Sequence, residues 1–297
     1  IDIALHRNGH TQGSRTELFQ HRLAPVQISY LGYPETLGAD FIDYLVADPV
    51  VIPEEERQYY NEKIIYLPDT YQPNDNTRQI AETNTTRADF GLPEEGFVLC
   101  CFNQNYKISP QEFDIWMRVL GQVEGTVLWL LKSNRWAEEN LKKEAEHRGI
   151  DPSRVIFAEK IPNAEHLARH KHADLFVDTF NYNAHTTASD ALWSGLPIVT
   201  KQGRQFAARV AASLLRAVGL PELITESEEE YERLILELAH DRQRLGAIKE
   251  TLKVNRHTEP LFDTQRYTHQ LEEGLGQAYQ QYFEGGNATD VIVAGTV

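Results

Sequence analysis

Short apolar runs alternate with amphipathic segments along most of the 297-residue chain. Apolar runs bounded by Gly, Pro or Asp predict strands, and they lie at 26–31, 44–47, 64–68, 97–102, 126–131, 155–157, 174–178 and 197–200. Apolar residues at helical spacing predict helices, which lie at 109–119, 137–148, 163–170, 186–193, 207–218 and through most of 228–283. Because one helix separates each pair of later strands, we expect βαβ units, a mostly parallel sheet and an α/β fold.

A polar stretch at 72–86 interrupts this pattern and predicts a linker. The part before it supplies about three strands, fewer than a doubly wound domain needs, and the chain opens without Met on a strand-like run. We therefore expect an N-terminally truncated chain. Residues 1–75 are expected to be the C-terminal part of an N-terminal Rossmann-like domain, 76–265 a C-terminal Rossmann-like nucleotide-sugar-binding domain, and 266–297 a helix and a frayed tail.

The composition narrows the choice of partners. A net charge of −15 argues against binding to nucleic acid, which requires a basic face. No run of 18 apolar residues exists, so we expect no membrane partner. Cys100 and Cys101 are adjacent in an apolar run and would point to opposite faces of a strand, so we interpret them as small buried side chains. Without a disulfide framework, the cytoplasm is the expected compartment.

The loop at 178–190 is the first candidate for chemistry. It follows a predicted strand and leads into a helix that begins near Thr186, where free N–H groups bind phosphate. Thr187 adds a second hydroxyl, and Asp190, one turn later, could accept a hydrogen bond from a ribose hydroxyl. The alternative is that Thr186 only caps a structural helix. The accompanying His185 favours binding.

The loop at 102–107 also directly follows a predicted strand. Lys107 can neutralise a diphosphate as a point charge, although a solvated loop lysine is the alternative. Its place at the same sheet edge as the 178–190 loop favours binding. The sequence has no P-loop, no G-x-G-x-x-G, no G-x-S-x-G and no Asp-x-Asp pair. A nucleotide diphosphate would then be neutralised by Lys, Arg and helix starts, which predicts a metal-independent site.

Three histidines lie on or directly after the predicted helix at 163–170. His166 and His170 are one turn apart, but the sequence shows no third ligand, so a metal site is not favoured. We expect a basic helix face near a diphosphate, and a solvated face for His170 and His172.

Glycine-containing loops follow the strands of the first part, at 7–11 and 32–36. His10 is the candidate there that titrates near neutral pH, with a structural role as the alternative. Both loops are expected to face a cleft between the two domains.

Taken together, these motifs resemble the catalytic region of the protein O-GlcNAc transferase family, in a bacterial-type member. The resemblance runs from Asn8 to about Tyr282. The matching stretches are Asn8-Gly9-His10-Thr11, Pro25-Val26-Gln27, Leu31-Gly32-Tyr33-Pro34, Phe102-Asn103-Gln104-Asn105-Tyr106-Lys107, Val127-Leu128-Trp129-Leu130-Leu131, His185-Thr186-Thr187 with Asp190, and Arg209-Val210-Ala211-Ala212-Ser213.

The resemblance implies a GT-B-type arrangement of two Rossmann-like domains with parallel sheets, the first incomplete. It also implies an inverting glycosyltransferase that moves GlcNAc from UDP-GlcNAc to Ser/Thr hydroxyls of proteins and needs no metal or other cofactor. Family members often carry upstream tetratricopeptide repeats that present protein substrates, and none lies in this chain.

On this resemblance, Lys107 and His10 are the catalytic candidates, and Lys107 touches the diphosphate. The nucleotide would be held by residues of the second domain: Gln104 beside Lys107, Thr186 and Thr187 on phosphate, His185 by the uridine, Asp190 on the ribose, and His166 and Arg169 flanking the base. The sugar and acceptor side would be formed by Leu31, Gly32 and Pro34.

The chain departs from the family at three positions. His6 stands where many bacterial relatives have an acidic residue, Glu35 where a small residue is common, and Asn163 where Lys is found. Related members transfer fucose from GDP-fucose, or glucose to asparagine. The alternatives are therefore GDP-fucose or UDP-glucose as donor, a glycan as acceptor, or a degenerate nucleotide-sugar-binding module.

Overall fold

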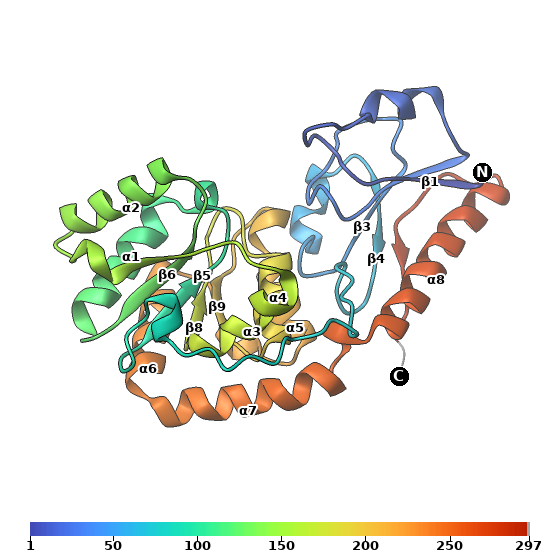
Figure 1. Cartoon of the computed structure of the whole chain (residues 1–297). Helices are drawn as coiled ribbons and strands as arrows, with labels where there is room; N and C mark the ends of the chain where they lie inside the picture. Colours follow the sequence, from blue (N-terminus) through green and yellow to red (C-terminus); the bar gives the residue numbers. More distant parts are fainter. Residues whose placement is uncertain (296–297) are drawn as a thin grey trace. The chain divides into compact units, whose positions relative to one another are not determined.

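The computed structural model describes residues 1–295, which form two compact units (Figure 1). Unit 1 contains Ile1–Asn76, Arg204–Ala217 and the chain from Glu259 onward, and unit 2 contains Thr77–Gly203 and Val218–Thr258. The structure thus differs from the three consecutive segments expected from the sequence, because two later segments return to unit 1. One contact that holds the segment 204–217 in unit 1 is made by Asp48, which directly follows the strand that ends at Ala47. Its carboxylate accepts a hydrogen bond from Ser213 Oγ (2.7 Å).

Unit 1 is built on a five-stranded parallel sheet with the order β1-β2-β3-β4-β11. Its strands are β1 (Ile3–His6), β2 (Val26–Ser29), β3 (Tyr44–Ala47), β4 (Lys63–Tyr66) and β11 (Val291–Ile292). Its helical segments are η1 (Thr16–His21), η2 (Glu54–Tyr59), η7 (Phe206–Ala208), α5 (Val210–Ala217), η9 (Pro260–Phe262) and α8 (Thr264–Phe283).

Helix α8 packs on the unit 1 sheet along its apolar face. Tyr267 and Ala278 are buried with strand residues of β2, β3 and β4, and a Cβ at Gly274 would lie only 2.6 Å from Cγ2 of Ile65. The missing side chain at Gly274 therefore allows the close approach of helix and strand.

The expected frayed tail is wrong for residues 291–293. Val291 and Val293 are each 2% exposed in the core, whereas Ile292 between them is 76% exposed. This alternation is typical of a strand, and β11 pairs in parallel with β4. Asp290, directly before it, accepts two hydrogen bonds of 2.7 Å from Arg57.

Unit 2 is built on a six-stranded parallel sheet with the order β10-β9-β8-β5-β6-β7. Its strands are β5 (Val98–Cys101), β6 (Val127–Leu131), β7 (Val155–Ala158), β8 (Leu175–Val177), β9 (Ile198–Lys201) and β10 (Ile224–Thr225). Its α-helices are α1 (Pro110–Gln122), α2 (Arg135–His147), α3 (Asn163–Arg169), α4 (Thr186–Trp193), α6 (Glu228–His240) and α7 (Arg242–Thr258). Its shorter helical turns are η3 (Ala88–Phe90), η4 (Asn105–Lys107), η5 (Pro152–Arg154), η6 (His170–His172) and η8 (Pro221–Leu223).

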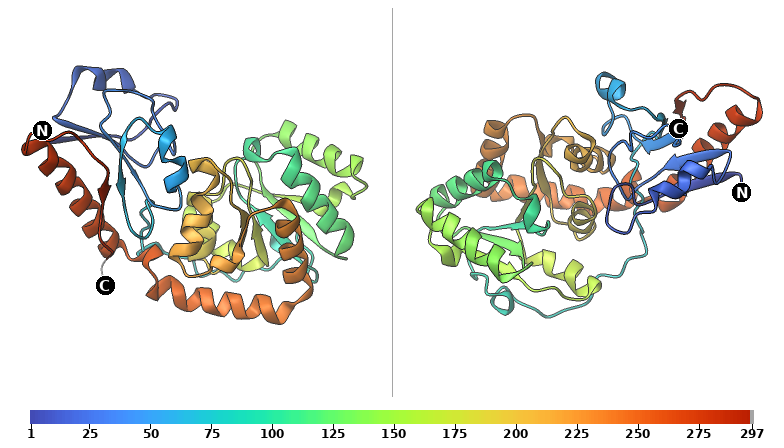
Figure 2. Two further views of the ribbon diagram at one scale, coloured as in Figure 1. Left: turned by 180° about the vertical axis from the view of Figure 1, so that it is seen from behind. Right: turned by 90° about the horizontal axis from the view of Figure 1, so that it is seen from above.

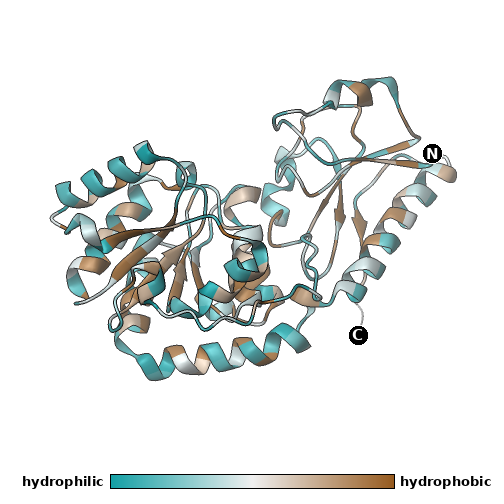
Figure 3. Cartoon of the chain, viewed as in Figure 1, coloured by the Kyte–Doolittle hydropathy of each residue, from teal (hydrophilic) through white to brown (hydrophobic). Residues whose placement is uncertain are grey.

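Helices lie on both faces of the unit 2 sheet, and the strands between them are hydrophobic (Figures 2 and 3). A polar cap begins α1 at Ser109, as the sequence predicted, whereas α2 begins at Arg135, two residues before its predicted start. Ser109 and Glu112 form a capping box at α1, with Pro110 in the first turn, and Asn134 caps α2. Cys100 and Cys101 are buried and free, which confirms their interpretation as small core side chains.

Within residues 1–295, no helix is both long enough and apolar enough to cross a bilayer.

Candidate functional site

The two polar loops predicted to carry chemistry meet at the carboxyl ends of β5 and β8, which are neighbouring strands. Lys107, in the turn after β5, donates a hydrogen bond from Nζ to the backbone carbonyl of Asn183 (3.1 Å) in the loop after β8. The same Nζ lies 3.8 Å from the ring centroid of Tyr182. The lysine is thus held against the loop that leads into α4 rather than free in solvent.

Burial sets the electrostatic state of Lys107. It lowers the pKa of the ammonium to about 8, and the nearby carboxylate of Asp178 opposes this shift. The group is therefore still charged at neutral pH, but only partly hydrated. A cation in this state interacts more strongly with an anionic ligand than a fully hydrated one does.

Asp178 is the centre of the hydrogen bonds beneath this site. Its carboxylate is fully buried and accepts hydrogen bonds from Thr179 N (2.9 Å), Ala184 N (2.6 Å), Thr200 Oγ1 (2.7 Å) and Asn103 Nδ2 (3.2 Å). Burial nevertheless raises the pKa of Asp178 to about 7. These bonds tie the loop before α4 to strands β5 and β9.

Helix α4 begins at Thr186, as the sequence predicted. His185 precedes it as the N-cap residue and makes no side-chain cap bond, so the alternative that Thr186 is the cap does not describe this helix. Thr186 is exposed, and Thr187 donates a hydrogen bond to Asn103 Oδ1 (2.5 Å). His185 stacks on Tyr182, with centroids 4.7 Å apart and planes at 23°. Free N–H groups at this exposed helix start can donate hydrogen bonds to a bound anion.

Gln104 lies in the same turn as Lys107. It is half-buried, and its carbonyl accepts the Lys107 N–H (2.9 Å). Asp190 lies one turn into α4, is 6% exposed and forms an ion pair with Arg78 (2.5 Å between Oδ1 and Nη1). This arginine lies in the polar stretch that the sequence predicts to be a linker.

Arg169 is buried rather than presented on a helix face. It is 1% exposed, donates to the Glu159 carbonyl (2.6 Å) and contacts His166 Nδ1, with its guanidinium carbon 4.5 Å from the Phe102 ring centroid. Burial, with Arg169 and His170 nearby, lowers the pKa of His166 to about 3. The His166 ring therefore stays neutral at physiological pH.

The expected solvated face for His170 and His172 is wrong, because both side chains are buried, at 1% and 7% exposure. His170 Nδ1 contacts the His166 carbonyl (2.8 Å), and its ring packs 5.2 Å from Phe102. His172 packs 5.2 Å from Phe90. The apolar partners, Phe90 and Phe102, come from distant segments of the chain. The basic sequence around these histidines therefore could not predict their burial. No group of three or more potential metal ligands occurs in the described part of the chain.

The predicted sugar-side residues form a cluster within unit 1, at the carboxyl ends of β1 and β2. A Cβ at Gly9 (φ +51°) would lie 2.1 Å from Tyr33 Cβ, and a Cβ at Gly32 would lie 2.0 Å from the Arg7 carbonyl oxygen. The two loops therefore touch through their glycines. Leu31 has φ +71°, a costly conformation for a residue with a side chain, which is typical of functional loops.

His10 and Pro34 lie in the same cluster. His10 is exposed, its Nε2 lies 3.2 Å from the Leu37 carbonyl, and its ring lies 5.3 Å from that of Tyr33. Pro34 is buried. Glu62, also buried, accepts hydrogen bonds from Leu37 N (2.7 Å) and Thr36 Oγ1 (2.6 Å), and so fixes the end of the loop.

Three residues at the unit 2 site, Asn103, Asp178 and Arg78, are not among those that the sequence motifs predict to bind the ligand. Asn103 and Asp178 each follow a buried strand, and that position is the signal that could have identified them. Arg78 had no local signal, because it lies in the polar stretch 112 positions before its partner.

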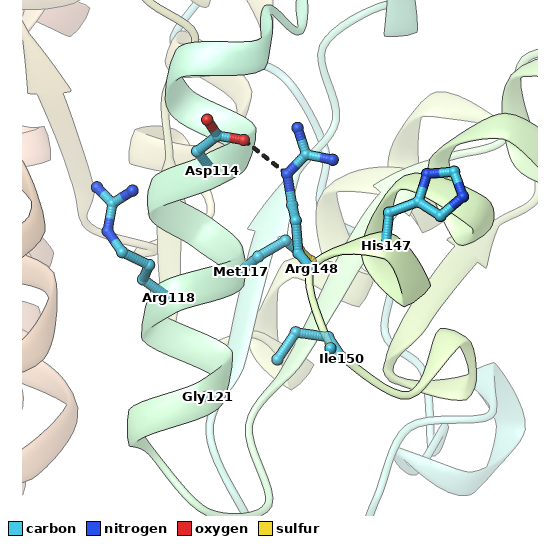
Figure 4. Close-up of a pocket in the computed structure, with 8 residues that line it drawn as sticks. Asp114, Met117, Arg118, Gly121, His147, Arg148 and Ile150 are labelled. Carbon is cyan, nitrogen blue, oxygen red and sulfur yellow. Dashed lines mark hydrogen bonds and ion pairs between the residues drawn. The ribbon is translucent and has the colours of Figure 1, made fainter.

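A separate pocket of about 700 Å³ lies between α1 and the end of α2 (Figure 4). After Ile150, which lines the pocket, the chain runs into the amino end of β7. The pocket therefore lies near the amino ends of the strands, away from the site loops at their carboxyl ends. Arg148 spans it and donates to Asp114 (2.6 Å). No residue predicted for the site lines this pocket.

Comparison with known proteins gives one family. The profile of glycosyl transferase family 41 matches residues 1–84 and 74–271. A probable UDP-N-acetylglucosamine–peptide N-acetylglucosaminyltransferase SEC from Arabidopsis thaliana is 38% identical over 96% of this chain and 30% of its own length. A UDP-N-acetylglucosamine–peptide N-acetylglucosaminyltransferase from Caenorhabditis elegans is 28% identical over 100% of this chain and 35% of its own length. The chain therefore spans about a third of these curated relatives.

Solved structures agree with this result. A Thermobaculum terrenum O-GlcNAc transferase mutant has a TM-score of 0.88 and 28% identity, over 96% of this chain and 54% of that one. Sucrose-phosphate synthase from Thermosynechococcus elongatus, at 14% identity, has a TM-score of 0.66 over 96% of this chain and 74% of its own, and shows a likeness of fold. With the two parallel sheets, these likenesses confirm the predicted GT-B-type α/β fold class.

Proposed function

Because this chain belongs to glycosyl transferase family 41, we propose that it forms catalytic machinery for transfer of GlcNAc from UDP-GlcNAc to Ser/Thr hydroxyls of proteins. The observation that carries the proposal is the contact of Lys107 with Asn183, which places a partly dehydrated ammonium beside the loop that starts α4. The names of the Arabidopsis and C. elegans relatives, which specify a sugar nucleotide and a peptide, support the kind of reaction.

The donor nucleotide is proposed to lie along the carboxyl edge of the unit 2 sheet. Lys107 and the N–H groups at the start of α4 bind the diphosphate, with the hydroxyls of Thr186 and Thr187 beside them. Gln104 and His185 contact the nucleoside, and Asp190 accepts from the ribose. His166 lies next to the base, and the buried Arg169 acts from behind it by holding the His166 ring.

In the proposed reaction, the acceptor hydroxyl oxygen forms a bond to C1 of the sugar while the bond from C1 to the UDP oxygen breaks. Attack opposite the leaving group inverts the configuration at C1. UDP leaves with the bonding electron pair, and Lys107 and the positive end of α4 stabilise the charge that develops on it. This stabilisation needs no metal. The acceptor proton passes to a base, for which His10 is the candidate.

The sugar and the acceptor are proposed to contact the unit 1 loops that carry Leu31, Gly32 and Pro34. The acceptor is proposed to be a protein in the cytoplasm, presented by tetratricopeptide repeats upstream of this region. The sequence has two cysteines, adjacent to each other, and so no disulfide framework, which fits a reducing compartment.

The donor is tested by thermal melting with UDP and with GDP. We expect UDP to raise the melting temperature of the chain and GDP to leave it unchanged. A shift with GDP alone would favour a GDP-sugar donor, and no shift with either nucleotide would contradict the proposal. Transfer is then followed with UDP-[¹⁴C]GlcNAc, and label on glycan rather than on protein would overturn the protein acceptor.

The role of Lys107 is tested with Lys107→Ala. Loss of a preorganised charge on the leaving group costs on the order of a hundredfold or more in kcat. Lys132→Ala is the matched control, because Lys132 follows the neighbouring strand β6 and pairs with Glu159 at the surface. A kcat near that of the unsubstituted chain for Lys107→Ala would contradict the assignment.

A further inference from the structure

The polar stretch at 72–86 contributes a charged and partly buried side chain, Arg78, to unit 2. Arg78 Nη1 forms a 2.5 Å ion pair with Asp190 Oδ1 on α4, and both side chains are largely buried, at 17% and 8% exposure. An ion pair this shielded from water is screened far less than a surface pair. It is therefore a specific feature of this site rather than a surface contact.

The backbone around Arg78 is fixed at two points. Trp193 Nε1, at the end of α4, donates a hydrogen bond to the Arg78 carbonyl (3.2 Å), and the Ala81 N–H donates to the Ala164 carbonyl (3.0 Å) in α3. The Arg78 guanidinium carbon also lies 5.9 Å from the Trp193 ring centroid. The arginine thus reaches Asp190 from a held backbone, which limits where the carboxylate can turn.

We propose that Arg78 is a positioning residue for the ribose of the bound nucleotide: it holds the Asp190 carboxylate ionised and oriented so that Oδ2 accepts a hydrogen bond from a ribose hydroxyl. The inference rests on the proposed function, which places the ribose at Asp190. An ionised carboxylate has two acceptor oxygens, and Arg78 engages Oδ1, so Oδ2 is the oxygen left to the ligand.

The environment of Asp190 explains why it needs this partner. Burial raises the pKa of Asp190, and Arg78 opposes the shift through its charge and its hydrogen bond. Without the arginine, a carboxyl group in this position would take up a proton more readily and would be free to rotate. Either change weakens and misdirects the acceptor for a ribose hydroxyl.

The test compares the affinities of UDP and 2′,3′-dideoxy-UDP, measured by calorimetry on the full chain. We expect the unsubstituted chain to prefer UDP by about tenfold or more, since a hydrogen bond to a charged group is lost in the dideoxy ligand. In Arg78→Met, which keeps much of the side-chain bulk, this preference should fall to about two- to threefold. The double variant Arg78→Met/Asp190→Asn should lose no more of the preference than Asp190→Asn alone.

Arg256→Met is the matched control. Arg256 also lies 5.9 Å from the Trp193 ring and donates to the Trp193 carbonyl (2.7 Å), whereas the ion pair with Asp190 is formed by Arg78. The Arg256→Met variant should prefer UDP over 2′,3′-dideoxy-UDP as strongly as the unsubstituted chain does.

Two outcomes would overturn the inference. If Arg78→Met weakens both ligands equally and leaves their ratio unchanged, Arg78 is only a structural support, while the proposed function stands. If the unsubstituted chain binds no UDP, the proposed function fails and this inference fails with it.

Discussion

Lys107 shows how burial sets the chemistry of a single residue. Its sequence position, directly after an apolar run, was enough to predict that it lies at the carboxyl edge of the sheet. Its lowered pKa follows instead from burial against a loop 70 to 80 positions later, which supplies Tyr182 and Asn183, while Asp178 from the same loop opposes the shift. Sequence therefore identified the residue, and tertiary contacts set its ionisation.

The pKa of about 8 predicts how nucleotide affinity depends on pH. Below pH 8 the Lys107 ammonium is charged and binds the diphosphate, and above it the free chain must take up a proton to bind. The affinity for UDP should therefore fall by up to about tenfold for each pH unit well above 8. Calorimetric titrations at pH 7, 8 and 9 measure it.

Lys107→Met is the control for this pH profile. It should bind UDP more weakly at pH 7 and show no fall between pH 7 and 9. An equal fall in the variant would assign the titration to another group.

Gly9 gives a second prediction at the residue scale. An added Cβ would lie 2.1 Å from Tyr33 Cβ at a φ of +51°, so Gly9→Ala must displace one of the two unit 1 loops. We expect a loss of about 1–3 kcal/mol in the free energy of unfolding, as is usual for overpacking and backbone strain. Chemical denaturation measures it.

Gly13→Ala is the matched control for Gly9. Gly13 also has a positive φ, of +78°, but no atom lies within 4 Å of an added Cβ. It should lose only the part of the stability that reflects backbone strain. Equal losses in the two variants would show that contact between the loops contributes nothing.

At the scale of elements, the predicted strands and helices mostly occur where apolar patterns placed them, and α4 has the predicted ends, Thr186 and Trp193. Among the strands, the exceptions are β10 and β11, each of two residues. Two residues carry no recognisable period. Strand β10 is defined by its pairing with the preceding strand β9, and β11 by its pairing with β4, far away in sequence.

The opposite burial of neighbouring residues in β11 leads us to expect different stability losses when each is substituted. Val291→Ser places a hydroxyl in the core and removes apolar contacts, which should cost about 2 kcal/mol of the free energy of unfolding. Ile292→Ser, one residue on, changes an exposed side chain and should stay within about 0.5 kcal/mol. Urea unfolding distinguishes them, and equal effects would contradict the pairing of β11 in solution.

At the scale of the whole molecule, buried histidines make stability depend on pH. Burial lowers the pKa of His166 to about 3 and of His170 to about 4, against 6.5 for an unburied histidine. The unfolded chain therefore takes up protons first as the pH falls. The stabilisation is complete above about pH 6.5 and is lost progressively as the pH falls toward the folded values, by about 1.4 kcal/mol per pH unit for each histidine.

His170→Asn tests this dependence. An Asn side chain can donate to the His166 carbonyl, as a neutral His170 does from Nδ1, but it does not titrate. Between pH 6.5 and 4.5 the variant should lose less stability than the unsubstituted chain, which thermal melting as a function of pH measures. Asp178 contributes with the opposite sign, because its folded pKa is raised, and it contributes equally to both proteins. Parallel curves would contradict the prediction.

The sequence by itself determined the class of fold, most of the elements and the loops that carry Lys107 and Thr186. These features depend on local periodicity and on the rule that parallel strands place their carboxyl ends at one edge. The tertiary structure decided the return of α5 and the C-terminal segment to unit 1, the burial of Arg169, His170 and His172, and the pairing of Arg78 with Asp190. All of these arise from contacts between segments far apart in sequence, where burial and charge depend on the partner rather than on the residue alone.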